Sequence, residues 1–599
     1  MDLRKFISEA VVFYETPDQE AKLTREAIIT YRVTSFLALC EAVLFKETRR
    51  EACGAMARRL LLTEDRYAFQ SPRPNCALFG AASAATAAGI LKAFGVLSEE
   101  DLDILAERTI PRLVDVNRQF LKRPPPRVSN HAMLSMAGSQ YFADLFPDHP
   151  GAPVLFEQAG VLWEDFWRIR DNPEVSSLYE PFSFMSHIQY AEATGRRDVY
   201  YNDPGIRAMF DRALQTLTPA GPMVAYCDAS WSASWGPWSA VFDKGAAVYR
   251  DGRYAWAADH IRQYAARHRV WDWPREIDRQ PVASAEAAQG LVSNFLIEIH
   301  GLAFARLWQD PAVASEEPTS DCAILYRTTP SDTQPPTAGP REQERVVLRG
   351  GWRGAAPFLA VPLMRRLMGH HQHDAGAIGM LMAGGAALLS QTGYFWKDAR
   401  FHNLLFARPA DEAFLAPYGK GSPAPESPGY TVDGVEEDGD AARFVASCER
   451  LHGYPIAHAR EIILNLGSGA CRVQDTIHVE EGHYRIAPLY HTDRIVASGP
   501  GWCDTTHEYV YRALGITIPN APMRLVVRFP EVSERLEQFA PQLRDDHFSS
   551  YNVPDWIETF LSSRTQHICV FHSAVVRAGE TCRIVSELIP HAPGEKVWE

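Results

Sequence analysis

The spacing of apolar side chains changes about halfway along the chain, from a helical period to a strand-like one. Between about residues 26 and 310 they recur every three to four positions in long stretches, and breaks containing Pro and Gly separate these stretches. This half therefore predicts an array of helical hairpins. The expected helices lie near 26–46, 77–95, 100–121, 154–170, 204–217 and 284–308.

Beyond residue 344 the apolar runs are short and Gly, Pro and Asp turns separate them, which is typical of an antiparallel β-sandwich. The chain is thus expected to be α+β and multidomain, with a helical domain at 1–330, a polar linker at 331–343 and a β-domain at 344–599. Segment 407–441 is predicted to be a long exposed loop. The expected strands cover about 345–349, 377–382, 386–390, 461–466, 471–479, 523–529, 567–572 and 582–588.

Composition narrows the class of protein. The length of 599 residues would suit about four ordinary domains, but the pattern divides it into two large units. Net charge is −14, which argues against a nucleic-acid or membrane-surface binder. The ten cysteines form no CxxC pair, as expected for a reducing compartment. The first residues contain no signal-peptide core, so the expected location is cytoplasmic, or secreted or periplasmic if a leader was removed.

The densest chemical signal is a histidine-rich segment, Gly369-His370-His371-Gln372-His373-Asp374-Ala375-Gly376. In an extended chain His371 and His373 project from the same face. Two imidazoles on one face can bind a metal, or can hold an anion and move a proton. The alternative is a polar loop without a function.

Further motifs accompany the histidine segment on both sides and in the helical half. They are Leu348-Arg349-Gly350-Gly351-Trp352, Gln391-Thr392-Gly393-Tyr394, Arg400-Phe401-His402-Asn403, Ser129-Asn130-His131 and Tyr179-Glu180-Pro181. With them the chain resembles the heparinase II/III-like polysaccharide lyases over most of its length. The resemblance implies an N-terminal (α/α) toroid of helical hairpins followed by a C-terminal antiparallel β-sandwich, which contributes His371, His373 and His402 to the cleft.

The resemblance also implies a reaction, β-elimination at a uronic acid that leaves a 4,5-unsaturated sugar. A base must remove the C5 proton, and donors must neutralise the adjacent carboxylate as charge develops. Asn130 and His371 would hold the carboxylate. His131 and Tyr179 would be the acid/base pair, with Tyr394 in reserve. The alternative for Asn130 and His131 is a helix N-terminus followed by a surface histidine.

The sequence departs from the family pattern at the tyrosine. Members of this family usually place a tyrosine about four residues after the glutamate that corresponds to Glu180. This chain has Phe184 at that position. Tyr179 would then have to reach the site from a displaced position, or Tyr190 or Tyr394 would replace it.

The metal pattern departs as well. Some relatives hold a structural zinc at positions that correspond to His373, Gln391 and His402. A glutamine is a poor zinc ligand because it brings no charge, although Asp374 or Asp398 would compensate. One divalent metal, zinc, is therefore a possible cofactor, and otherwise His373 and His402 form a pair that orients His371.

A tryptophan-rich segment offers candidate sugar contacts. Trp231, Trp235 and Trp238 fall within eight residues, and aromatic faces at a cleft stack on sugar rings. The alternative is packing against the next helix. Arg353 and Arg400 are charged candidates for substrate binding.

The preferred interpretation is a lyase acting on a uronate-containing oligo- or polysaccharide, without nucleic-acid or membrane partners and with a possible homo-oligomer. One alternative is a glycoside hydrolase on a helical toroid, for which Glu180 and Asp228 would supply the carboxylate pair. The other is a catalytically silent glycan-binding protein. The net charge of −14 then excludes only long-range attraction of a polyanion, because hydrogen-bond donors in the cleft are enough to bind a uronate carboxylate locally.

Overall fold

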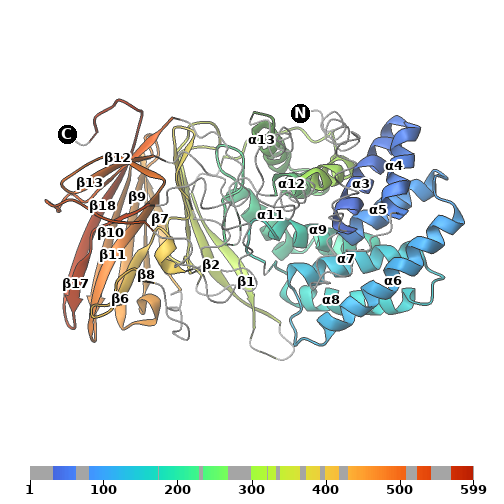
Figure 1. The fold of residues 1–599 in the computed structure, drawn as a ribbon, viewed down its shortest axis with the longest axis horizontal. Coiled ribbons are helices and arrows are strands. Elements are labelled where there is room, and N and C mark those ends of the chain that lie inside the picture. Colours follow the sequence, from blue (N-terminus) through green and yellow to red (C-terminus); the bar gives the residue numbers. More distant parts are fainter. Residues whose placement is uncertain are drawn as a thin grey trace.

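The computed structural model divides the chain into a helical unit and a β-unit that lie side by side (Figure 1). This is the α+β architecture expected from the sequence. None of the helices in the described part is both long and apolar enough to cross a bilayer. The described residues are 31–62, 80–172, 174–227, 229, 234–267, 298–319, 322–331, 333, 337–364, 373–390, 398–416, 429–506, 522–540 and 568–597.

The helices alternate between an inner and an outer position. In α5, α7, α9 and α12 buried residues occur on every side, as in a helix enclosed by protein. In α6, α8 and α11 they form one stripe, as in a helix with an exposed face. Successive inner helices pack on one another, so the hairpins form a curved double layer. The bounds are α3 (Tyr31–Thr48), α4 (Glu51–Leu62), α5 (Ala81–Ala93), α6 (Glu99–Leu121), α7 (Asn130–Leu145), α8 (Ala152–Ile169), α9 (Glu180–Ala193), α10 (Arg197–Tyr201), α11 (Pro204–Gln215), α12 (Trp235–Tyr249) and α13 (Gly252–Arg267), and residues 298–308 are also helical.

The β-unit contains three antiparallel sheets. Their strand orders are β1-β2-β3-β4-β5, then β12-β13-β14-β18-β10-β9-β8-β7, and β15-β16-β11-β17 with β6 added beside β11. The bounds are β1 (Ala323–Pro330), β2 (Ala338–Arg349), β3 (Phe358–Pro362), β4 (Met380–Ala383), β5 (Ala386–Ser390), β6 (Leu405–Pro409), β7 (Thr431–Asp438), β8 (Ala441–Cys448), β9 (Ile456–Asn465), β10 (Cys471–Val479), β11 (His483–Thr492), β12 (Arg494–Gly499), β13 (Trp502–Thr506), β14 (Arg524–Arg528), β15 (Glu537–Phe539), β16 (Ile568–Phe571), β17 (Ala574–Arg577) and β18 (Thr581–His591).

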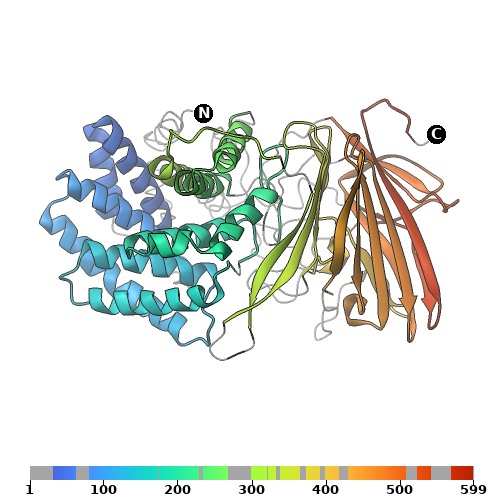
Figure 2. The ribbon, with the colours of Figure 1, turned by 180° about the vertical axis from the view of Figure 1, so that it is seen from behind.

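The β1–β5 sheet lies between the helices and the rest of the β-unit (Figure 2). Its alternate residues belong to different cores. Val347 and Ala360 join the core of the helical unit, whereas their neighbours Val346 and Leu359 join the core of the sandwich. Because both faces are covered along β3, β4, β5 and the last residues of β2, these segments are mainly continuous apolar runs rather than an alternating pattern.

The linker predicted at 331–343 is wrong in part, because β1 already begins at Ala323 and β2 at Ala338. The first residues of β2 are mostly exposed, which explains their polar composition and the missing strand signal. Likewise, β6 and β7 occupy the two ends of the loop predicted at 407–441. β7 is an edge strand with most side chains exposed.

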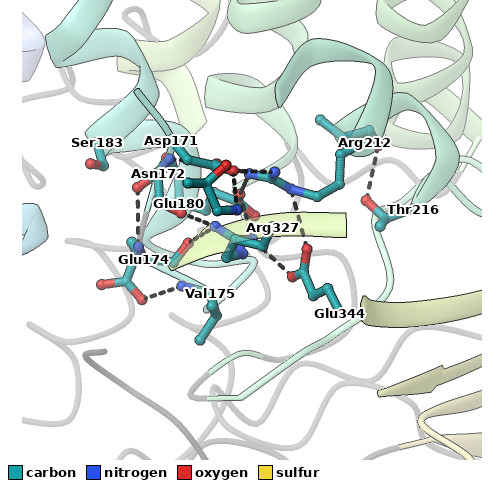
Figure 3. Close-up of polar contacts among 12 residues, drawn as sticks. Asp171, Asn172, Glu174, Val175, Glu180, Ser183, Arg212, Thr216, Arg327 and Glu344 are labelled. Atoms are coloured by element: carbon teal, nitrogen blue, oxygen red, sulfur yellow. Dashed lines mark hydrogen bonds and ion pairs between the residues drawn. The ribbon is translucent and has the colours of Figure 1, made fainter. Parts of the chain in front are cut away.

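A buried network of ion pairs joins the two units (Figure 3). We call it the seam network, and it comprises Asp171, Glu180, Arg212, Arg327 and Glu344. From β1, Arg327 Nη2 donates to Glu180 Oε1 at 3.0 Å and to Glu344 Oε1 at 2.8 Å. From α11, Arg212 donates to both carboxylate oxygens of Asp171, at 2.7 and 3.1 Å. All five side chains are buried, so solvent screens these charges little.

Glu344 is the acidic centre of this network. Its carboxylate lies 2.8 Å from Nη2 of Arg345 and 3.3 Å from Nε of Arg212. Burial alone would raise its pKa, but the positive charges of Arg327, Arg345 and Arg212 outweigh burial and lower the pKa to about 2. Removing one partner of a buried pair leaves the other charge uncompensated and costs about 3–5 kcal/mol.

We expect the contribution of Glu344 to stability to be lost in acid. Its pKa falls from the ordinary value of 4.5 to about 2 on folding, so its contribution is complete above about pH 4.5 and declines as the pH falls toward 2. Melting temperatures of the wild type and Glu344→Gln should differ widely at about pH 7, and the difference should narrow below about pH 4.5. A difference that stayed constant over this range would contradict the pairing.

Candidate functional site

Two neighbouring inner helices, α7 and α9, begin at the same end of the helical unit. The short turn 146–151 joins α7 to α8, so these helices run antiparallel. α8 and α9 are also antiparallel, because Phe166 stacks on His187 while Trp163, earlier in α8, stacks on Tyr190, later in α9. α7 and α9 are therefore parallel, and they pack directly on one another.

The inner helix α12 begins at this end too. The indole Nε1 of Trp238 donates to the carbonyl of Ser177 at 2.9 Å, and Ser234 Oγ donates to the carbonyl of Leu178 at 2.7 Å. Ser177 and Leu178 directly precede α9. Three inner helices thus begin at the end that carries Glu180 of the seam network, and this end faces the β-unit.

The N-terminus of α12 is closed by an internal carboxylate. Glu298 accepts hydrogen bonds from the backbone N–H groups of Ser234 at 2.7 Å and Gly236 at 2.8 Å. Burial raises the pKa of Glu298 to about 8, although these two bonds act in the opposite direction. These two N–H groups at the start of α12 are therefore not available as hydrogen-bond donors to a ligand.

Asn130 supplies such a donor at the first residue of α7. Ser129 caps the helix by accepting from Ala132 N, and Asn130 Oδ1 accepts from the backbone N–H of His131 at 2.9 Å. Asn130 is 3% exposed, and its Nδ2 has no hydrogen-bond partner among the described residues. The side-chain oxygen of Asn130 therefore has a partner at the helix start, whereas its side-chain nitrogen has none among the described residues.

The two predicted acid/base residues stand next to these helix ends. His131 and Tyr179 are both half-buried, and Tyr179 is the residue that precedes α9. Phe184, where relatives place the tyrosine, is buried and packs on Phe210 with ring centroids 4.5 Å apart. Tyr190 is also buried, inside the wall between α8 and α9, so it is no substitute.

The predicted residues His371, Tyr394, Gln391 and Trp231 lie outside the described residues, as does Asp228. The chain that follows the histidine segment does approach the helical unit. A Cβ at Gly379 would lie 3.5 Å from Cε1 of Tyr226, whose backbone N–H donates to Ser177 Oγ at 3.0 Å. This part of the β-unit thus reaches the loop that precedes α9.

The metal site remains a prediction. His402 is 1% exposed, at the end of the 3₁₀ turn Ala399–Phe401, and His373 is half-buried with its Nδ1 buried. Within the described ranges no group of three His, Cys, Asp or Glu side chains could hold a metal.

Three side chains predicted to contact substrate are buried, so those predictions are wrong. Trp235 and Trp238 are 1% and 0% exposed, so neither presents a ring face to a sugar, and both fit the packing alternative. Arg400 is 3% exposed and donates to the carbonyl of Leu415 at 2.9 Å, which makes it part of the sandwich interior. Arg353 is exposed and pairs with Glu317 at 2.6 Å, and its binding role stays a prediction.

Sequence reasoning missed the charged residues at the seam. The local signal was present in β2, where Glu344 and Arg345 occupy buried positions of an otherwise apolar strand. Charged side chains are almost never fully buried unless paired. The guanidinium of Arg345 lies 3.6 Å from the ring centre of Tyr226, a tyrosine that was not singled out. Burial, opposed by Arg345, raises the pKa of the Tyr226 phenol.

No protein-family model matches the sequence, and no curated protein matches it either. Solved structures do match. The crystal structure of heparan sulfate lyase HepC from Pedobacter heparinus is 12% identical with a TM-score of 0.51, over 99% of this chain and 83% of that one. A crystal structure of heparinase III is 12% identical with a TM-score of 0.54, over 92% of this chain and 76% of that one. The chain therefore has the toroid-plus-sandwich fold of these polysaccharide lyases.

Proposed function

We propose that the protein is a lyase that cleaves a uronate-containing oligo- or polysaccharide by β-elimination. The observation that carries this proposal is the buried Nδ2 of Asn130, which has no partner in the described part of the chain. A buried donor left unpaired costs about 1–3 kcal/mol, and a ligand acceptor would relieve that cost. A carboxylate is an acceptor with two oxygens, as the C6 group of a uronate offers.

The helix ends supply the electrostatics that the reaction needs. The starts of α7 and α9 carry partial positive charge, which favours an anion. Together with the Asn130 amide they would draw charge from the uronate carboxylate, so that the C5 proton becomes acidic enough to remove. The net charge of −14 does not oppose this, because the donors are local.

His131 and Tyr179 are the proposed proton-transfer groups. One takes the C5 proton, the C4–O4 bond breaks as the C4–C5 double bond forms, and the other returns a proton to the departing O4. Both residues stand at the end of the helical unit where α7 and α9 begin, and both are half-buried. Imidazole and phenol groups are both suited to such transfers.

The hydrolase alternative loses one of its carboxylates. Glu180 is 7% exposed, accepts from Arg327 at 3.0 Å and lies 3.6 Å from Arg212. A hydrolase needs two carboxyl groups that face the scissile bond. Glu180 instead faces the seam network, so elimination is favoured.

We expect the wild-type protein to release a product that absorbs ultraviolet light from at least one uronate glycan or oligosaccharide. The absorbance arises because elimination conjugates a new C4–C5 double bond with the carboxylate. A panel of sulfated and unsulfated uronate substrates, followed by absorbance and by mass, tests this. Cleavage without the chromophore would indicate the hydrolase, and retention without cleavage would indicate the glycan-binding protein.

We expect Asn130→Ala to lower kcat/KM by about 100- to 1,000-fold, the loss typical of one oxyanion donor. Its melting temperature should stay close to that of the wild type, because the substitution removes an unsatisfied buried donor together with the acceptor of the His131 N–H. Asn130→Asp should be less active still, since it sets a negative charge against the substrate carboxylate. Wild-type turnover in Asn130→Ala would rule out the role of this amide.

We expect His131→Ala to lower kcat by about 100- to 10,000-fold through the loss of proton transfer. His149→Ala is the matched control, since His149 lies in the turn at the opposite end of α7 and pairs with Glu107 at 3.5 Å. The control should turn over substrate like the wild type. Equal rates in the two variants would remove His131 from the mechanism.

A further inference from the structure

Hydrogen bonds within the loop and to its neighbours hold the loop that leads into α9. We call its described residues, 171–172 and 174–179, the α9-leading loop. Glu174 Oε1 accepts from the backbone N–H groups of Val175 at 3.1 Å and Ser176 at 3.0 Å. The backbone N–H of Tyr179 donates to the carbonyl of Ser176 at 2.9 Å. The loop thus has a defined internal shape that ends at Tyr179.

Arg327 ties this shape to the β-unit (Figure 3). Its Nη1 donates to the backbone carbonyls of Asn172 and, at 3.2 Å, of Glu174. Its Nη2 donates to Glu180 at the start of α9 and to Glu344 on β2. One guanidinium therefore contacts the start of the loop, the helix that follows the loop, and the neighbouring strand.

The other attachments of the loop come from both units, and they include the backbone N–H of Thr328 on β1, which donates to Asp171 Oδ2 at 2.8 Å. Tyr226 and Trp238 bind Ser177, and Ser234 binds Leu178. Arg345 on β2 adds a contact from Nη2 to the carbonyl of Val175 at 3.4 Å. Arg327 differs from these attachments because, from the β-unit, it contacts both the start of the loop and Glu180, the first residue of α9, and so it helps to set where Tyr179 stands relative to the β-unit.

We propose that Arg327 is a positioning residue for the elimination reaction, which fixes Tyr179 and the first turn of α9 against the β-unit. The inference rests on the proposed function, because it assigns a catalytic consequence to an anchored loop. Arg327 itself is 1% exposed and cannot touch substrate. Its effect on the reaction passes entirely through the α9-leading loop.

Only a guanidinium fits this role. Its planar fork directs separate N–H groups to the carbonyls on one side and to the carboxylates on the other. A lysine ammonium keeps the charge for Glu344 and Glu180 but cannot also reach both carbonyls from a single nitrogen. Arg327→Lys therefore keeps the positive charge but removes hydrogen bonds to the loop carbonyls, so it distinguishes the two contributions.

The test compares Arg327→Lys with Arg262→Lys. Arg262 on α13 is a matched control, since it is 6% exposed and its Nη1 donates to Asp243 at 2.7 Å and to Ser239 at 2.9 Å. Arg327→Lys should lower kcat by about 10- to 100-fold with KM changed by less than about threefold, because a misplaced group lowers turnover more than binding. Arg262→Lys should alter melting temperature and leave kcat unchanged.

Amide hydrogen exchange supplies a readout that does not depend on activity. In Arg327→Lys the amides of Val175, Ser176 and Tyr179 should exchange about tenfold faster than in the wild type, while those of α13 stay protected. Should Arg327→Lys not fold, Glu344→Gln, which removes the strand-side partner, should produce the same changes to a smaller degree.

Unchanged exchange in the loop, or a folded Arg327→Lys with wild-type kcat, would overturn the proposal. Failure of the proposed function has a different signature, since the wild type would then eliminate none of the uronate substrates. In that case amide hydrogen exchange alone tests whether Arg327 anchors the α9-leading loop. Faster exchange confined to the loop would support it, and exchange like that of the wild type would refute it.

Discussion

The β1–β5 sheet is covered by protein on both faces along β3, β4, β5 and the last residues of β2. Its alternate residues, such as Val346 and Val347, enter the sandwich core and the helical core respectively. Separating the two units would expose one of these faces, at about 25 cal/mol for each Å² of apolar surface. The two units therefore share a common wall, and polar groups buried along that wall must find partners within the protein rather than in solvent. The seam network is the consequence of this constraint.

Buried ion pairs are costly, and an apolar replacement of the same shape is often as stable. Apolar contacts, however, do not specify the orientation of the groups that they join. Arg327 contacts two carbonyls and two carboxylates in a geometry that allows one placement of α9 against β1 and β2. Specificity of placement is a reason for retaining charge here, because the residues next to this helix start are those to which the proposed function assigns the chemistry.

The sequence predicted the two units because their apolar periods differ. Each strand range that it gave overlaps a strand of the structure, but β1, β3, β6 to β8, β11 to β13, β15 and β17 were not predicted. It placed Asn130 and Tyr179 at helix starts from short motifs, and the structure has both beside inner helices. It could not predict the seam, because Arg327 and Glu180 are 147 residues apart and nothing local links them. It misjudged Arg400 and Trp238 because a motif gives residue type and order, whereas burial depends on packing partners elsewhere in the chain.

Phe184 occupies the position at which the resemblance to the lyases implies a tyrosine. Phe184 is buried against Phe210, at the interface between an inner and an outer helix, and offers no proton. Tyr190 is likewise enclosed by Trp163. In the proposed mechanism, proton transfer at this end of the toroid is assigned to His131 and Tyr179, which are both half-buried there. The position of a tyrosine that precedes its helix depends on the loop that carries it, and in this chain hydrogen bonds from Arg327 and Trp238 hold that loop.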